Sequence, residues 1–129
     1  MDQNELNQKF MVFEQQIRQI QEQLQLVEQA IFEIGNIKTG LNELVGKVDE
    51  EILAPIGKGI YAKTKLLSEE LTVDVGGGNF VKKSIPETQN LIDGQLEKLK
   101  SIREELENEL NKINQELTKV MVEAQGKKD

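Results

Sequence analysis

Apolar residues recur in alternating steps of four and three at both ends of the chain, and polar residues fill the positions between them. This spacing places apolar side chains on one stripe of an α-helix and is typical of a coiled-coil seam. The first seam is Leu6, Phe10, Phe13, Ile17, Ile20, Leu24, Val27, Ile31, Ile34, Lys38, Leu41 and Val45. The second seam is Ile92, Leu96, Leu99, Arg103, Leu106, Leu110, Ile113, Leu117, Val120 and Ala124. We therefore expect one helix over residues 4–46 and another over residues 86–124.

The two seams match each other when the chain folds back on itself. The facing pairs are Phe10 with Val120, Ile17 with Ile113, Leu24 with Leu106, and Ile34 with Leu96. In each pair an a position of the heptad meets a d position, as antiparallel knobs-into-holes packing requires. The pattern predicts a long antiparallel coiled-coil hairpin.

The helix boundaries also carry local signals. Asp2 or Asn4 is suited to cap the first helix, and Gly46 to end it. The segment Ser84-Ile85-Pro86-Glu87 has the serine-to-glutamate spacing of a capping box, with proline in the first turn. We expect the second helix to begin there.

Two seam positions, Lys38 and Arg103, are charged. The simpler interpretation is that their aliphatic stems pack in the seam while the charged ends reach solvent. The alternative is that they select the register by making slipped pairings unfavourable. We favour the first interpretation, because Ile37 and Ile102 lie next to them and can cover the gap.

The pattern changes to period two between the helices, over residues 52–85. Candidate strands cover residues 52–56, 60–66, 71–75 and 80–85, and glycine-rich segments at 57–59 and 76–78 separate the first pair and the second pair. Strands joined by such turns form β-hairpins. The chain is therefore predicted to be a single α+β domain, residues 1–129, in which a coiled-coil hairpin carries two central β-hairpins.

The apolar faces of these hairpins are too large to stay in water, and an isolated hairpin is only marginally stable. The coiled coil offers only a narrow stripe, which its own partner helix already covers. The hairpins are therefore expected to pair with strands from other subunits. The residues predicted to mediate this oligomerisation are Leu53, Ile56, Ile60, Leu66, Leu71, Val73, Val75, Phe80, Val81 and Ile85.

Composition narrows the function. The chain has 129 residues, a net charge of −7, and neither cysteine nor histidine. The missing basic face argues against nucleic acid as a partner, and no apolar stretch is long enough to span a membrane. The absence of cysteine and of a recognisable secretion signal fits a reducing, cytoplasmic location.

Two motifs invite a catalytic or ligand-binding interpretation. Gly76-Gly77-Gly78 resembles a phosphate loop in composition, but a strand pattern follows it where a helix should begin. A hairpin turn is the better interpretation. Adjacent acids such as Glu104 and Glu105 diverge on a helix and do not converge on a metal. We expect a protein that is not an enzyme and that has no cofactor or metal site.

Extra apolar residues cluster near both termini, where the antiparallel register brings them together. They are Phe10, Met11, Val12 and Phe13 with Val120, Met121 and Val122. One interpretation is a simple packing pad at the end of the coiled coil. The other is an exposed surface that binds apolar polypeptide, for which methionine and phenylalanine are well suited.

The central motifs resemble a known family. Leu53-Ala54-Pro55-Ile56-Gly57-Lys58-Gly59-Ile60-Tyr61-Ala62 and Leu71-Thr72-Val73-Asp74-Val75-Gly76-Gly77-Gly78 look like the two hairpins of the α-class subunit of prefoldin. Subunits of the β class have one hairpin, so two hairpins indicate the α class. The departures are Asn79-Phe80, where the family often has an aromatic-rich turn exit, and Thr88, where it often has a smaller residue.

The resemblance implies an ATP-independent chaperone, or holdase, that passes unfolded polypeptides to a group II chaperonin. It implies a hexamer of two α and four β subunits in which the hairpins form an intersubunit β-barrel platform. By position, the clustered residues near the termini would bind the client. A filament-forming prefoldin-like protein, or a structural coiled coil that tethers one defined partner, is the alternative.

Overall fold

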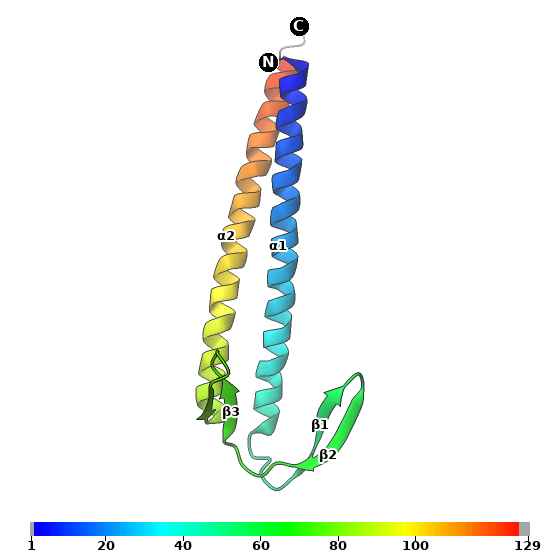
Figure 1. Ribbon diagram of the computed structural model, residues 1–129. Helices are drawn as coiled ribbons and strands as arrows, with labels where there is room; N and C mark the ends of the chain where they lie inside the picture. The colour runs from blue at the N-terminus through cyan, green and yellow to red at the C-terminus, as the bar shows by residue number, and fades with distance from the viewer. Residues whose placement is uncertain (1, 127–129) are drawn as a thin grey trace. The chain divides into compact units, whose positions relative to one another are not determined.

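The structure, a computed structural model that describes residues 2–126, contains two long helices and two β-hairpins (Figure 1). The elements are α1 (Gln3–Leu44), β1 (Glu51–Gly57), β2 (Ile60–Lys65), β3 (Leu71–Asp74), β4 (Phe80–Lys83) and α2 (Ile85–Gly126). The predicted α+β class, two long helices with two small antiparallel hairpins between them, is confirmed. The chain forms two compact units, the terminal unit (residues 1–32 and 98–129) and the central unit (residues 33–97).

The terminal unit consists of the first part of α1 packed against the last part of α2. Its core is formed by Ile20, Leu106 and Ile113. The half-buried residues around this core are Phe13, Ile17, Leu24, Val27 and Leu110. In each of the predicted pairs Ile17–Ile113 and Leu24–Leu106, one member belongs to this core and the other packs against it, as the expected antiparallel register requires.

The central unit has its own core, where the second part of α1 meets the start of α2. Leu41, Ile85 and Ile92 are buried there. Ile34 and Leu96 pack against them as predicted, and Leu71 of β3 packs against them too. Leu71 thereby attaches the second hairpin to the helices.

The helix ends follow the capping signals. Asp2 caps α1, because its side-chain oxygen accepts a hydrogen bond of 3.2 Å from the backbone N–H of Asn4. At α2 the backbone N–H of Glu87 donates to Ser84 Oγ at 3.2 Å, and Ser84 Oγ donates to Glu87 Oε1 at 3.0 Å. The capping box therefore starts α2 at Ile85.

This start corrects one sequence assignment. The period-two pattern placed Ile85 at the end of the last strand, but β4 ends at Lys83 and Ile85 is the first helical residue. Its side chain is 2% exposed inside the core of the central unit. The Ile85 side chain is therefore buried within its own chain and is unavailable for oligomerisation.

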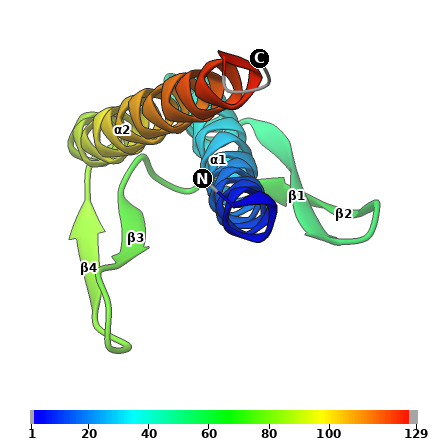
Figure 2. The ribbon, with the colours of Figure 1, turned by 90° about the horizontal axis from the view of Figure 1, so that it is seen from above.

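The two hairpins are separate two-stranded antiparallel sheets (Figure 2). β1 pairs with β2 with a register shift between Pro55 and Gly57, and β3 pairs with β4 with Val73 opposite Val81. Gly76, Gly77 and Gly78 all have positive φ angles in the turn between β3 and β4. This backbone is typical of glycine-rich turns, so the hairpin interpretation of the triple glycine is confirmed.

The charged seam residues form ion pairs across the helices. Lys38 Nζ lies 2.7 Å from Asp93 Oδ1, and Arg103 Nη1 lies 3.4 Å from Glu28 Oε1. Both side chains remain partly exposed, so their charged ends reach the edge of the seam while the stems lie along it. Pairs this exposed contribute about 0–1 kcal/mol to stability.

Two glycines within the helices of the central unit offer a test of helix propensity. No atom lies within 4 Å of a Cβ added at Gly35 or Gly94, and neither residue has a positive φ. Gly35→Ala and Gly94→Ala are each expected to raise the free energy of unfolding by about 1 kcal/mol, because alanine loses less backbone entropy in a helix. Thermal unfolding followed by circular dichroism measures the change.

The matched control is Gly46→Ala. Gly46 also has open space around its Cβ position, but its φ is +76°, just after the end of α1. An alanine there is strained, so this variant is expected to be less stable than the parent chain. Equal stability of all three variants would contradict the explanation.

Candidate functional site

The clustered residues near the termini divide into two groups in the structure. Phe10, Phe13 and Val120 are partly buried in the seam of the terminal unit. Met11, Val12, Met121 and Val122 are between 48 and 67% exposed. We call these four residues the terminal patch. The cluster therefore has a partly buried inner part and an exposed apolar outer part, and its binding of polypeptide stays a prediction.

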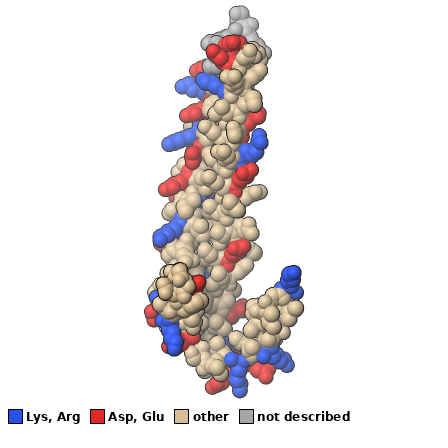
Figure 3. Space-filling model, viewed as in Figure 1, with Lys and Arg blue, Asp and Glu red and all other residues tan. Residues whose placement is uncertain are grey.

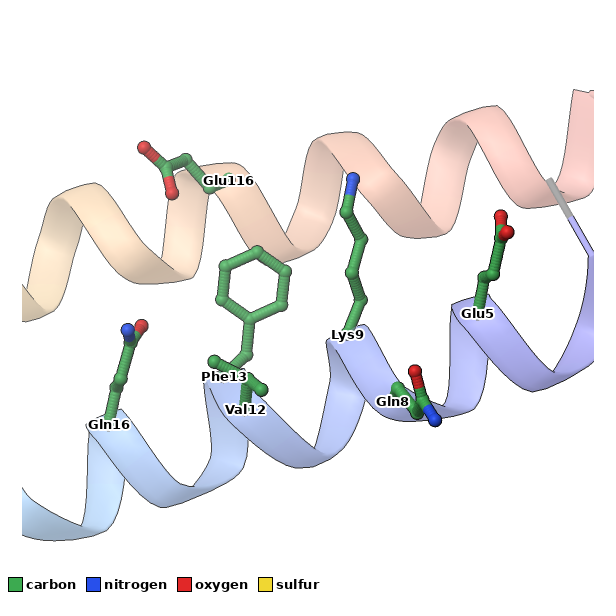
Figure 4. A pocket seen from close by; sticks show the side chains of 7 residues that line it. All are labelled: Glu5, Gln8, Lys9, Val12, Phe13, Gln16 and Glu116. Carbon is green, nitrogen blue, oxygen red and sulfur yellow. The ribbon is translucent and has the colours of Figure 1, made fainter.

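An open hollow of about 610 Å³ adjoins the terminal patch (Figure 4). It is lined by Glu5, Gln8, Lys9, Val12, Phe13 and Gln16 of α1 and by Glu116 of α2. The ring of Phe13 points toward α2, and Lys9 extends in the same direction beside it (Figure 4). Val12 lines the hollow and is also one of the four residues of the terminal patch.

The sequence analysis did not identify Gln8, Gln16 or Glu116 as site residues. They lie off the seam, where polar residues on a helix usually only face water. For Gln8 and Gln16 the available signal was their spacing of four residues from Val12, which places them on the same side of α1. Glu116 lies on α2, and its place in the same hollow agrees with the predicted pairs Phe10–Val120 and Ile17–Ile113.

The hairpin residues predicted to mediate oligomerisation also divide by exposure. Leu53, Ile56, Ile60, Val75, Phe80 and Val81 are exposed in the chain. Leu66, Leu71 and Val73 are partly buried, and Leu71 packs on the core of the central unit. We call the six exposed residues the hairpin surface. It includes three apolar side chains on each hairpin.

Two acids of the hairpin region have structural contacts. The backbone N–H of Gly46 donates to Glu69 Oε1 at 2.7 Å, and Glu70 Oε1 lies 3.5 Å from Lys82 Nζ. Glu69 thus joins the segment before β3 to the turn that follows α1, and Glu70 pairs with Lys82 of β4. Among residues 2–126, no three acids approach closely enough to hold a metal ion.

Charges of both signs are interspersed on the visible face of the helices (Figure 3). No large area of one sign appears on that face. Within the part of the chain that the structure describes, no helix has the length and hydropathy to cross a membrane.

Comparisons with known proteins point to one family. A family model described as "Prefoldin subunit" matches residues 13–128. Prefoldin subunit alpha of Methanobrevibacter smithii is 32% identical over 85% of this chain and 71% of its own length. Prefoldin subunit alpha 1 of Methanocaldococcus jannaschii is 30% identical over 97% of this chain and 94% of its own length.

A solved structure has the same fold. The cryo-EM structure of filamentous PFD from Methanocaldococcus jannaschii superimposes with a TM-score of 0.77 and covers 91% of this chain and 98% of its own. Its sequence is 18% identical, so the likeness concerns the fold alone.

Proposed function

The chain belongs to the prefoldin family, and on that premise we propose that it is a subunit of an ATP-independent holdase that binds unfolded polypeptides at the terminal patch. Members of this family are chaperone subunits that assemble with other prefoldin subunits. The proposal extends this to the site on this chain, to the unfolded clients and to their delivery to a group II chaperonin in the cytoplasm.

The exposure of the terminal patch carries the proposal. Two methionines and two valines are about half exposed or more near the ends of two packed helices, while the seam residues beside them are partly buried. Unbranched methionine side chains adapt to differently shaped apolar partners. An unfolded chain exposes apolar segments of many sequences, so an adaptable patch suits it better than a rigid pocket does.

The hairpin surface supports the assembly that such a function needs. We propose that it joins two copies of this chain to four β-class subunits through an intersubunit β-barrel, as the family resemblance implies. Each terminal patch then binds weakly on its own. Several patches on one assembly raise the apparent affinity roughly 10²–10⁴-fold if one client reaches more than one of them.

Two measurements test the proposal. The assembly should suppress aggregation of two unrelated unfolded proteins without ATP, because the patch recognises exposed apolar segments in general. Native mass measurement of the chain alone and with β-class subunits should detect the mixed hexamer. A structural coiled coil that tethers one partner would not suppress the aggregation of either protein. A filament-forming protein would give a series of masses above that of a hexamer.

A further inference from the structure

A second hollow continues the first along one side of the terminal unit. The two share Gln16 of α1 and Glu116 of α2. The second hollow, of about 430 Å³, adds Gln19, Ile20, Glu109, Lys112 and Ile113. Together they form a groove that follows α1 from Glu5 to about Ile20, which we call the lateral groove.

The bottom of the lateral groove is apolar. Phe13 is partly buried, and Ile20 and Ile113 are buried in the core of the terminal unit. Val12, at the end nearer the N-terminus, is exposed and also belongs to the terminal patch. Apolar side chains of a bound segment therefore have contacts along the groove and at Val12.

The polar residues of the groove do not favour a client segment of one particular charge. On α1, Glu5 and Lys9 have opposite signs, and on α2 the order is Glu109, Lys112, Glu116. The other polar lining groups on α1 are neutral amides, and Gln16 and Glu116 lie at the shared middle. A glutamine amide both donates and accepts hydrogen bonds, as the peptide group of a client does.

We propose that an unfolded client lies in this groove in extended conformation, with its main chain bonded to the amides of Gln16 and Gln19. This inference rests on the proposed function and specifies how the client is held. From Glu5 to Gln19 the helix rises about 20 Å, which is the length of about six extended residues. In a strand, alternate side chains point toward the apolar floor and alternate ones toward solvent, and the main-chain bonds are independent of sequence.

The test is the double variant Gln16→Met, Gln19→Met in the full chain within its assembly. Methionine is close to glutamine in length and helix propensity, and it makes the groove more apolar. The affinity of the variant assembly for a fluorescent peptide of alternating valine and threonine is measured by fluorescence anisotropy. If the amides bind the main chain, the variant is expected to bind about tenfold more weakly. A purely apolar groove would bind the same peptide as tightly or more tightly.

A second peptide isolates the main-chain contacts. Methylating alternate backbone nitrogens removes donors while keeping every side chain. The parent assembly is expected to bind the methylated peptide about tenfold more weakly. The double variant should lose much less on methylation, because the acceptors are already absent.

The control is Gln21→Met with Gln25→Met, which changes two glutamines of α1 that line neither hollow. This variant is expected to bind like the parent. If the parent assembly binds neither the peptide nor unfolded proteins, the proposed function itself fails. If the parent binds and Gln16→Met, Gln19→Met binds equally well, only the lateral groove assignment is overturned.

Discussion

A chain carrying Ile56→Asp and Ile60→Asp is expected to remain folded but to leave its assembly. Ile56 and Ile60 are 71 and 60% exposed at the turn end of the first hairpin. Neither belongs to the buried core of the central unit or to the residues packed against it. If another subunit covers these two side chains, burying each one contributes about 1.5–3 kcal/mol to the free energy of association. An aspartate carboxylate buried in their place makes association less favourable still. The affinity of each hairpin contact should therefore fall by at least about 10²–10⁴-fold.

Size-exclusion chromatography and native mass measurement follow the assembly, and circular dichroism follows the helices. Leu26→Asp is the matched control, because Leu26 is also highly exposed but lies on α1 and outside the hairpin surface. It should assemble normally. An unaltered assembly of the double variant would show that the first hairpin does not join the subunits.

Replacing the terminal patch with Met11→Gln, Val12→Gln, Met121→Gln and Val122→Gln is expected to remove client protection while leaving the assembly intact. Glutamine keeps the helix propensity close to that of methionine and removes most of the apolar contact area. Each side chain is about half exposed, so burying the exposed part under a client is worth about 1 kcal/mol. Losing all four contacts is therefore expected to lower the affinity of one patch for a client about 10³-fold.

The measurement is suppression of aggregation of two unrelated unfolded proteins, at equal assembly concentration. Leu26→Gln with Ile102→Gln is the control, because these are exposed apolar residues of the terminal unit outside the patch. That control should protect both clients as well as the parent. Full protection by the patch variant would place the client elsewhere on the molecule.

The local signals in the sequence predicted the helices and their pairing well. A heptad seam is a repeated one-dimensional pattern, and the structure buries, at least partly, all but one of its positions. Val45 is the exception, because α1 ends at Leu44. The capping box correctly marked the start of α2, but the period-two pattern around Ile85 competed with it and led to the wrong element. The cap prevailed because Ile85 as first helical residue reaches the core beside Leu41 and Ile92.

The sequence by itself determined the antiparallel register, the two hairpins and their glycine turns, because each depends on spacing or backbone preference within a short segment. Only the tertiary structure decided which apolar residues stay available. Ile85 and Ile56 look alike in a strand pattern, yet one is buried by its own chain and the other is exposed. Phe13 and Val12 are neighbours in the sequence, but Phe13 packs in the seam and Val12 is exposed at the surface. Exposure depends on what another element brings against a side chain, and the lateral groove likewise exists only where α1 and α2 pack together.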